Sequence, residues 1–428
     1  MFSKSQTNDV PNPGLIDVLR NPAFFIFSLS VIFSQVAFNM MNIVLIFQAF
    51  KLNGSSLAVS FLILAITIPQ ALFSFLGGIV GDAKNKRFIL IIGNTLRALF
   101  VIGFFFFSES LAYLYLAAFL ISLTTQFYVP AETPIIPHIV KKNYLLAANS
   151  LFGVFLFGSI LVGYVMGGPL LKFFGHTNNY LFIGALFLSA TVFAYLIPNI
   201  PTSVKIGFTQ KGGLKSARKI IGLVFSEFKE SISIVNKNKE VGSAVVFLAL
   251  AQVITLIMAT IIPDFAVSHL TIDAEDMSLV IFAPAALGMI FMALFIGAYF
   301  KKTSGNSLMN LGIFLSSSVL ILLALIPYQS LLLPIVGTVI LAFFAGVANA
   351  LIFVPSQTII QSTVHDNYRS KIYGLIFTLA GVLVLLPIVL TGLFADIFGA
   401  EIILIALSIF IFLVGIRRIK VKERILKI

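Results

Sequence analysis

The chain has 428 residues, of which 59% are hydrophobic and only 10% are charged, and its formal net charge is +12. Soluble domains are typically about 45–50% apolar and about 25% charged, so a soluble protein of this length could not cover so much apolar surface. There is no cysteine, and the four histidines are scattered. This excludes a disulfide framework and a thiolate nucleophile and argues against zinc. We therefore predict a membrane protein with no metal site and no cofactor.

Twelve apolar runs are long enough to cross a bilayer, which takes about 20 helical residues. In chain order we expect spans at 22–49, 56–80, 88–107, 110–130, 145–171, 179–199, 241–265, 277–299, 307–327, 331–357, 371–395 and 401–416. The first run is too long for the apolar part of a signal peptide and lacks a small-residue cleavage site, so we expect it to be retained. The predicted fold class is an all-α membrane protein with twelve transmembrane helices.

The basic residues divide unevenly between the connections. Connections that follow odd-numbered spans contain only Lys51 and Lys172, Arg97 lies inside the third span, and the other 25 of the 28 Lys and Arg residues lie in the termini and the remaining connections. Basic residues close to spans stay in the cytoplasm. We therefore predict cytoplasmic N- and C-termini and a plasma-membrane location. The positive charge reports topology, and we predict no nucleic-acid partner.

A similar sequence segment, which we call the repeated phrase, occurs twice, as VPAETPIIPHIVKKNY at 129–144 and as VPSQTIIQSTVHDNY at 354–368. The copies end spans 4 and 10, which are six spans apart, so the two halves have the same orientation. This pattern is typical of parallel repeats about an axis along the membrane normal. We predict a six-helix half at 1–200, a cytoplasmic linker at 201–240 and a second six-helix half at 241–428.

The linker has an amphipathic pattern. Apolar residues recur at helical spacing, with Lys and Glu on the other face, at Leu214, Ala217, Ile221, Val224, Phe228 and Val235. We interpret this stretch as a helix that lies on the membrane surface. The alternative is a solvated, charged linker.

The loop after span 2 reads GGIVGDAKNKR and resembles the G-x-x-x-D-R-x-G-R-R signature of the major facilitator superfamily. Gly78, Asp82, Lys86 and Arg87 match, whereas Ala83 and Asn85 depart from the signature. The resemblance covers the whole chain, and with the parallel repeat it implies the major facilitator fold. It also implies a conformational latch, in which Asp82 contacts the start of span 11 and the basic pair contacts Glu132. The alternative is that these charges only set topology.

Span 5 contains a glycine series that resembles the signature of exporters in this superfamily. Tyr164 replaces the proline of that signature, and the matching glycines are Gly158, Gly163, Gly167 and Gly168. The stretch after span 4 resembles the macrolide-efflux and siderophore-exporter branch, and lysophospholipid transporters have similar patterns. Small residues at this spacing also serve ordinary helix packing in membranes, which is the alternative.

Polar side chains inside spans are costly in hydrocarbon and tend to face a cavity. In the superfamily, spans 1, 4, 7 and 10 line the transport cavity, and here these spans contain Gln35, Asn39, Asn42, Gln126, Gln252, Thr255 and Asn349. The first three share one helical face. We predict a substrate pathway, with interhelical hydrogen bonding as the alternative for any single amide.

Arg97 is the one charge well inside a span. Its side chain could reach towards the cytoplasmic interface or pair with an acid. Carboxylates appear only towards span ends, at Glu132 and Asp264. Glu132 is our first candidate for proton coupling, because the second copy of the repeated phrase has Gln357 at its place.

No soluble-enzyme motif and no nucleotide-binding loop is present, so we predict a transporter and not an enzyme. The preferred function is export of hydrophobic or amphipathic small molecules by proton antiport, by a monomer in the lipid bilayer. The alternatives are a lysophospholipid flippase of the same fold and a non-transporting scaffold or receptor.

Overall fold

The computed structural model describes residues 15–83, 85–141, 144–199, 237–273, 276–299, 303–326, 333–364 and 366–426, together with 232, 233 and 235. Within these ranges the chain is helical and has no strand. Twelve helical segments are long and apolar enough to span a membrane. The prediction of an all-helical protein with twelve spans is therefore confirmed. The linker helix predicted at 214–235 falls almost wholly outside the described residues.

The first six spans are formed by α2 (Pro22–Asn53), α3 (Ser56–Ala83), α4 (Lys86–Phe107), α5 (Leu111–Glu132) and α7 (Leu145–Leu196). A short α1 (Leu15–Leu19) precedes them, and the turn η1 (Thr133–Ile135) and α6 (Ile136–Ile139) follow α5. Within this group α2 and α4 pack on α7, and α3 packs on α5.

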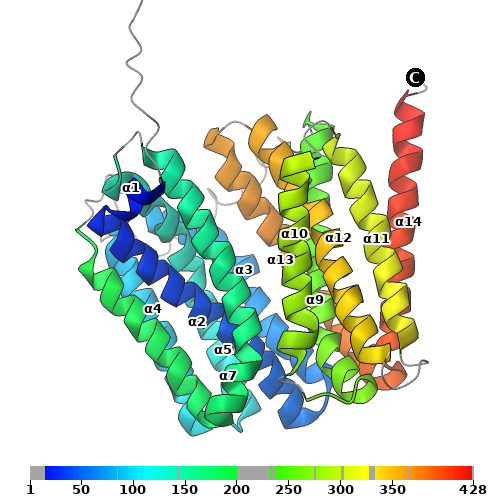
Figure 1. Cartoon of the computed structure of the whole chain (residues 1–428), viewed down its shortest axis with the longest axis horizontal. Coiled ribbons are helices and arrows are strands. Elements are labelled where there is room, and N and C mark those ends of the chain that lie inside the picture. Colours follow the sequence, from blue (N-terminus) through cyan, green and yellow to red (C-terminus); the bar gives the residue numbers. More distant parts are fainter. Residues whose placement is uncertain are drawn as a thin grey trace, which may run out of the picture.

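The last six spans are formed by α9 (Lys239–His269), η4 (Ser278–Phe282) with α10 (Ala283–Tyr299), α11 (Gly305–Leu325), α12 (Leu333–Thr363), α13 (Asp366–Phe398) and α14 (Ala400–Leu426). Here α12 packs on α10 and α11, and α14 packs on α11. Figure 1 shows the two groups side by side, α1–α7 on the left and α9–α14 on the right.

Spans 5 and 6 form one continuous element, α7, which breaks at Gly175. Gly175 has φ +75°, and Gly399, between α13 and α14, has φ +88°. Residues with a side chain rarely adopt this left-handed backbone conformation, whereas glycine adopts it without steric cost. Glycine therefore lets the chain turn back at the same place in each group, between its fifth and sixth spans.

The bundle has two ends, which we name by the chain. The terminal end contains α1 and the C-terminal end of α14, and the distal end contains the junction of α2 with α3 (Figure 1). The main apolar core joins both groups in the distal half, where α2 residues 43–50 pack with residues of α9 and α13. A second core closes the terminal end of the first group around Phe27, Leu90, Tyr128 and Ile136.

Candidate functional site

Arg97 lies inside α4, and only 2% of its surface is exposed. Its guanidinium carbon lies 4.0 Å from the ring centre of Tyr128, 5.6 Å from that of Phe38 and 5.9 Å from that of Phe187. The rings come from α5, α2 and α7, so a cation is enclosed by four helices. Aromatic faces attract a desolvated cation by about 2 kcal/mol. The side chain is held inside the protein and does not reach the interface.

A hydrogen-bond chain ties this cation to α2. Nη1 of Arg97 donates to Oγ of Ser34 over 3.2 Å, and Oγ of Ser34 donates to Oδ1 of Asn94 over 2.8 Å. Nε of Arg97 and Nδ2 of Asn94 are buried without an acceptor. Buried polar atoms are nearly always paired, so unpaired ones point to a further group or a second arrangement.

Glu132, at the end of α5, is 2% exposed. Nε2 of Gln35 donates to its Oε2 over 3.4 Å, while its Oε1 and the hydroxyl of Tyr128 are buried without partners. Glu132 and Arg97 interact electrostatically without a direct ion pair. The structure therefore brings an acid and a base together inside the first group of helices. We call Ser34, Gln35, Asn94, Arg97, Tyr128 and Glu132 the Arg97 cluster.

Residues of the segment that follows Glu132 in the chain are buried as well. The chain continues as η1 and α6, whose Ile135 and Ile136 are fully buried in the core of the terminal end. The segment that follows Glu132 is thus part of the core of the first group. Glu132 lies at the end of its span, as expected, but apolar length alone did not reveal that the side chain is buried there.

The predicted latch residues have other partners in this conformation. Arg87 donates through Nη2 to the carbonyl of Tyr195 and lies 5.1 Å from that ring, and Lys86 is buried. The expected pairing of this basic pair with Glu132 is thus not present: Arg87 anchors α4 to the end of α7. Gly78 and Asp82 belong to the last turns of α3, but the surroundings of Gly78 and the side chain of Asp82 lie outside the described part of the structure.

Of the predicted pathway residues, Gln35 reaches the Arg97 cluster. Three others bond within their own helices: Asn39 to the carbonyl of Gln35, Gln126 to that of Ser122 and Thr255 to that of Ala251. Oδ1 of Asn42 is buried without a partner. Gln252 and Thr255 are exposed on α9, and Asn349 is half-buried on α12. The structure does not gather the seven into one cluster.

The glycines of span 5 serve close packing. A Cβ at Gly163 would lie 2.6 Å from Cβ of Asn39, and one at Gly167 would lie 3.1 Å from a methyl carbon of Ile43. These two therefore let α7 approach α2. A Cβ at Gly158 would meet nothing within 4 Å, and the backbone N–H of Gly168 donates to Oγ of Ser278 over 3.0 Å.

Polar contacts join the two groups of helices towards the distal end. Asp396 of α13 accepts from the backbone N–H groups of Ser56 over 2.7 Å and Leu57 over 3.2 Å, and also from the hydroxyl of Ser55. Lys172 of α7 pairs with Asp276 before η4. We call these contacts the distal clasp. Further along, Oγ of Ser60 donates to the carbonyl of Ile388 over 2.8 Å, so α3 packs along α13 as predicted for spans 2 and 11.

The sequence matches a family model described as Major Facilitator Superfamily over residues 27–386. The chain belongs to the Major Facilitator Superfamily. It is also 23% identical over 383 residues to an MFS-type transporter of Bacillus subtilis (strain 168), YfiS, which is described as uncharacterized, and the match covers 87% of this chain and 86% of YfiS.

Solved structures of the superfamily share the fold. The nucleoside transporter NupG superposes with a TM-score of 0.70 at 12% identity, covering 92% of this chain and 98% of NupG. A POT family transporter in complex with 5-aminolevulinic acid superposes with a TM-score of 0.73 at 12% identity, and the match covers 94% of this chain and 96% of that transporter. At this identity the likeness concerns the fold alone. Family and fold together identify the protein as a multi-pass membrane transporter of the Major Facilitator kind.

Sequence reasoning missed three members of the Arg97 cluster, Ser34, Asn94 and Tyr128. It also missed the two phenylalanines beside Arg97, Phe38 and Phe187. Helical spacing could have found Asn94 and Tyr128, because Asn94 lies one turn before Arg97 and Tyr128 lies one turn before Glu132. It could not have found Ser34, because Ser34 and Gln35 are adjacent and do not share a helical face. The phenylalanines could not be singled out among 45.

Proposed function

We propose that this transporter exports hydrophobic or amphipathic small molecules in exchange for protons, and that Glu132 binds the proton. The observation that supports this most is the enclosure of the Glu132 carboxylate beside Arg97, with Oε1 unpaired. Ionisable groups inside membrane proteins are expensive and typically mark ion or substrate pathways. A buried acid that interacts with Gln35, Arg97 and Tyr128 without a direct ion pair is suited to gain and lose a proton.

A proton on Glu132 would change what the cluster binds. The ionised carboxylate is attracted by Arg97, whereas the protonated form loses that attraction and becomes a hydrogen-bond donor. A bound ion shifts a conformational equilibrium only through such a difference between states. In the present conformation the distal clasp holds the two groups of helices together at the distal end. Opening that end requires Asp396 and Lys172 to release their partners.

We infer that the terminal end faces the cytoplasm, because 25 basic residues lie in the termini and the connections on that side and two lie on the other. The measurement is cysteine labelling in intact cells, which suits a chain without native cysteine. A cysteine at Ser108 should react with an impermeant thiol reagent, and one at Ser304 should not. The reverse pattern would invert the proposed orientation.

Export is supported by the likeness of the span 4–5 region to the macrolide-efflux and siderophore-exporter branch. We further propose that Gly78, Asp82, Lys86 and Arg87 act as a latch when the terminal end closes, and that the polar groups on spans 1, 4, 7 and 10 contact cargo. The protein would work as a monomer, because each chain contains both groups of six spans.

The test uses cells that lack their own exporters and are loaded with a lipophilic dye or a macrolide. Cells that make the protein should accumulate less than control cells, and a protonophore should abolish the difference. Glu132→Gln removes the titratable group with little change in shape and should abolish export. The matched control is Glu109→Gln, the same change at an exposed carboxylate of the distal end, which should export normally.

Two outcomes would replace this proposal. If sodium removal stops export and the protonophore does not, the coupling ion is sodium. If the dye is not exported but labelled lysophospholipid crosses the membrane, the protein is a lipid flippase. Normal export by a well-folded Glu132→Gln variant would remove Glu132 from the mechanism.

A further inference from the structure

His269 and Glu401 form an ion pair at the distal end of the second group of helices. Nε2 of His269 lies 2.9 Å from Oε1 of Glu401, and the two side chains are 21% and 17% exposed. His269 belongs to the last turn of α9 and Glu401 to the first turn of α14. The last turn of a helix favours a positive charge and the first turn a negative one, so both helices favour the charged form of this pair. The attraction between the charges exists only while the imidazole carries its second proton.

Two further carboxylates lie close to this pair. Asp264, on α9 itself, interacts electrostatically with three residues, which are His269, Glu401 and Asp396 of the distal clasp. Of the other helices that pack on α9, α3 and α12 have no charged residue in their distal halves, and α2 has the exposed Lys51. Three acids therefore lie around one histidine, and the charge of that histidine decides whether their mutual repulsion is offset.

The pair is also linked to the packing between the two groups of helices. The ring of His269 lies 5.4 Å from that of Phe265, which is 4% exposed and belongs to the core that α9 shares with α2. Asp396, which interacts with Asp264, accepts from backbone N–H groups of α3 in the distal clasp. Opening the distal end would admit water between the groups, and water screens charges. The repulsion between the acids is therefore strongest in the closed conformation, and a cation at His269 reduces it there.

We propose that His269 is a pH sensor of the distal end. With its second proton bound, His269 holds Glu401 and offsets the negative charge beside the distal clasp, which favours the closed conformation. Histidine ordinarily changes its charge between about pH 5 and 8. As the pH rises through that range, the three acids lose the cation that offsets them, and the distal end opens more readily. The inference is independent of the proposed export function, because it concerns only the equilibrium between the closed and open conformations.

The test measures the open fraction of the purified full-length protein in detergent, where both ends of the bundle meet the same pH. Spin labels on cysteines at Asn53 and Phe398 report the separation of the two groups at about pH 5.5 and at about pH 8. The ratio of open to closed molecules should be about two- to fivefold larger at the higher pH, which is the range for one partly exposed ion pair. His269→Lys is charged at both pH values, so it should remain as closed at the higher pH as at the lower.

Neutral variants separate this sensor from the other acids. His269→Gln should lose the pH response, whereas His138→Gln, the same change at an exposed histidine of the terminal end, should keep it. Glu401→Gln should weaken the response, and it tests the pair from α14 if His269→Gln does not fold. An undiminished response in a folded His269→Gln or Glu401→Gln variant would overturn the proposal. So would a response that disappears in Glu132→Gln while His269 is intact, a result that would support the proposed proton site instead.

Discussion

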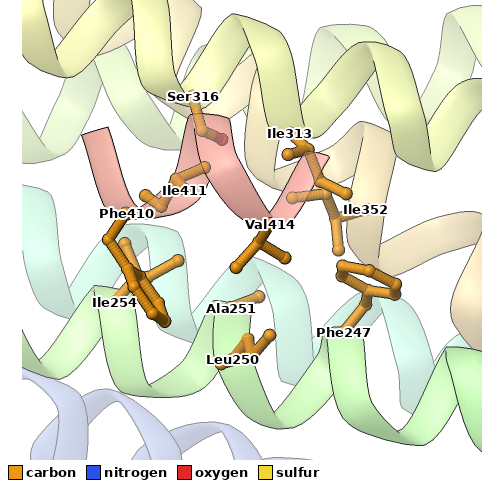
Figure 2. A pocket seen from close by; sticks show the side chains of 10 residues that line it. All are labelled: Phe247, Leu250, Ala251, Ile254, Ile313, Ser316, Ile352, Phe410, Ile411 and Val414. Atoms are coloured by element: carbon orange, nitrogen blue, oxygen red, sulfur yellow. The ribbon is translucent and has the colours of Figure 1, made fainter. Parts of the chain in front are cut away.

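The Arg97 cluster of the first group has a counterpart in the second, a small apolar pocket lined by residues that include Phe247, Ala251, Ser316, Ile352 and Val414 (Figure 2). The two occupy matching places in the two groups of six spans. Arg97 lies twelve residues after the N-cap Asn85 of α4, and Ser316 lies twelve residues after the N-cap Ser304 of α11. Ser34 and Ala251 each lie thirteen residues after the N-caps Asn21 and Asn238. The repeated phrase extends the match, because Glu132 corresponds to Gln357. The same backbone therefore holds a buried charge pair in one group and an apolar pocket in the other.

The two groups therefore share the same backbone geometry but differ in the polarity of the side chains at equivalent positions. Gly93 and Gly312 correspond, and at each a Cβ would come within about 3 Å of the neighbouring helix, so both pairs of helices approach equally closely. Among the described residues, by contrast, a fully buried arginine close to a fully buried glutamate is found in the first group alone. Taking one ion out of water costs several kcal/mol, and only oppositely charged or hydrogen-bonding neighbours offset that cost. A charged site that occurs once therefore needs such neighbours in one group of helices alone.

At the distal end the two groups remain alike. Lys172 and Asp396 each lie three residues before a glycine with positive φ, and each reaches across to the segment that begins span 8 or span 2 of the other group. The distal clasp is thus built twice from equivalent positions, whereas the cluster is built once. Variants at equivalent positions of the two groups can therefore show where the groups behave alike and where they differ.

The largest effect is expected from Arg97→Met. Removing one member of a buried charge pair leaves the other uncompensated, which costs about 3–5 kcal/mol. The unfolding free energy in detergent should therefore fall by about that amount. Ser316→Ala at the equivalent position removes a hydroxyl that bonds only within its own helix and should change stability by less than about 1.5 kcal/mol. Similar losses in the two variants would contradict the chemical difference between the groups.

A smaller loss is expected from Tyr128→Leu, which removes the ring that lies 4.0 Å from Arg97. Lost cation–π attraction and lost packing should together cost about 2–4 kcal/mol. Tyr128→Phe keeps the ring and discards a hydroxyl that has no partner, so it should remain within about 1 kcal/mol of the parent. Denaturation of both variants is the measurement. If Tyr128→Phe lowers the stability as much as Tyr128→Leu does, the hydroxyl and not the ring stabilises the site.

The smallest effects concern the distal clasp. Asp396→Ala removes the acceptor of two backbone N–H groups at the start of α3, which should weaken the closed state by about 1–2 kcal/mol. Lys172→Gln breaks an ion pair whose side chains are 45% and 37% exposed, so it should matter by only about 0.2–1 kcal/mol. Spin labels on cysteines at Asn53 and Phe398 report the separation of the two groups at this end. The open fraction should rise more for Asp396→Ala, and the opposite order would contradict this account.

Some elements of the site could be predicted from the sequence and others could not. Gln35, Arg97 and Glu132 were singled out because polar and charged residues are rare in apolar spans. That Arg97 faces Glu132 could not be foreseen, because the two lie on different helices and no pattern in one helix states which face a neighbour covers. In this conformation Arg87 binds the carbonyl of Tyr195 instead, and the pairing of Lys86 and Arg87 with Glu132 stays a prediction.

The sequence by itself determined the membrane class, the twelve spans and the repeat. These follow from apolar length and from repeated residues, which are local properties of the chain. Only the tertiary structure decided which polar groups meet: it buried Glu132 near Arg97, enclosed Arg97 within three aromatic rings from three helices, and left the equivalent place in the second group apolar. The physical reason is that burial and charge pairing are set by neighbours distant in sequence, and the free energy of an ionisable group depends on those neighbours more than on the residues beside it in the chain.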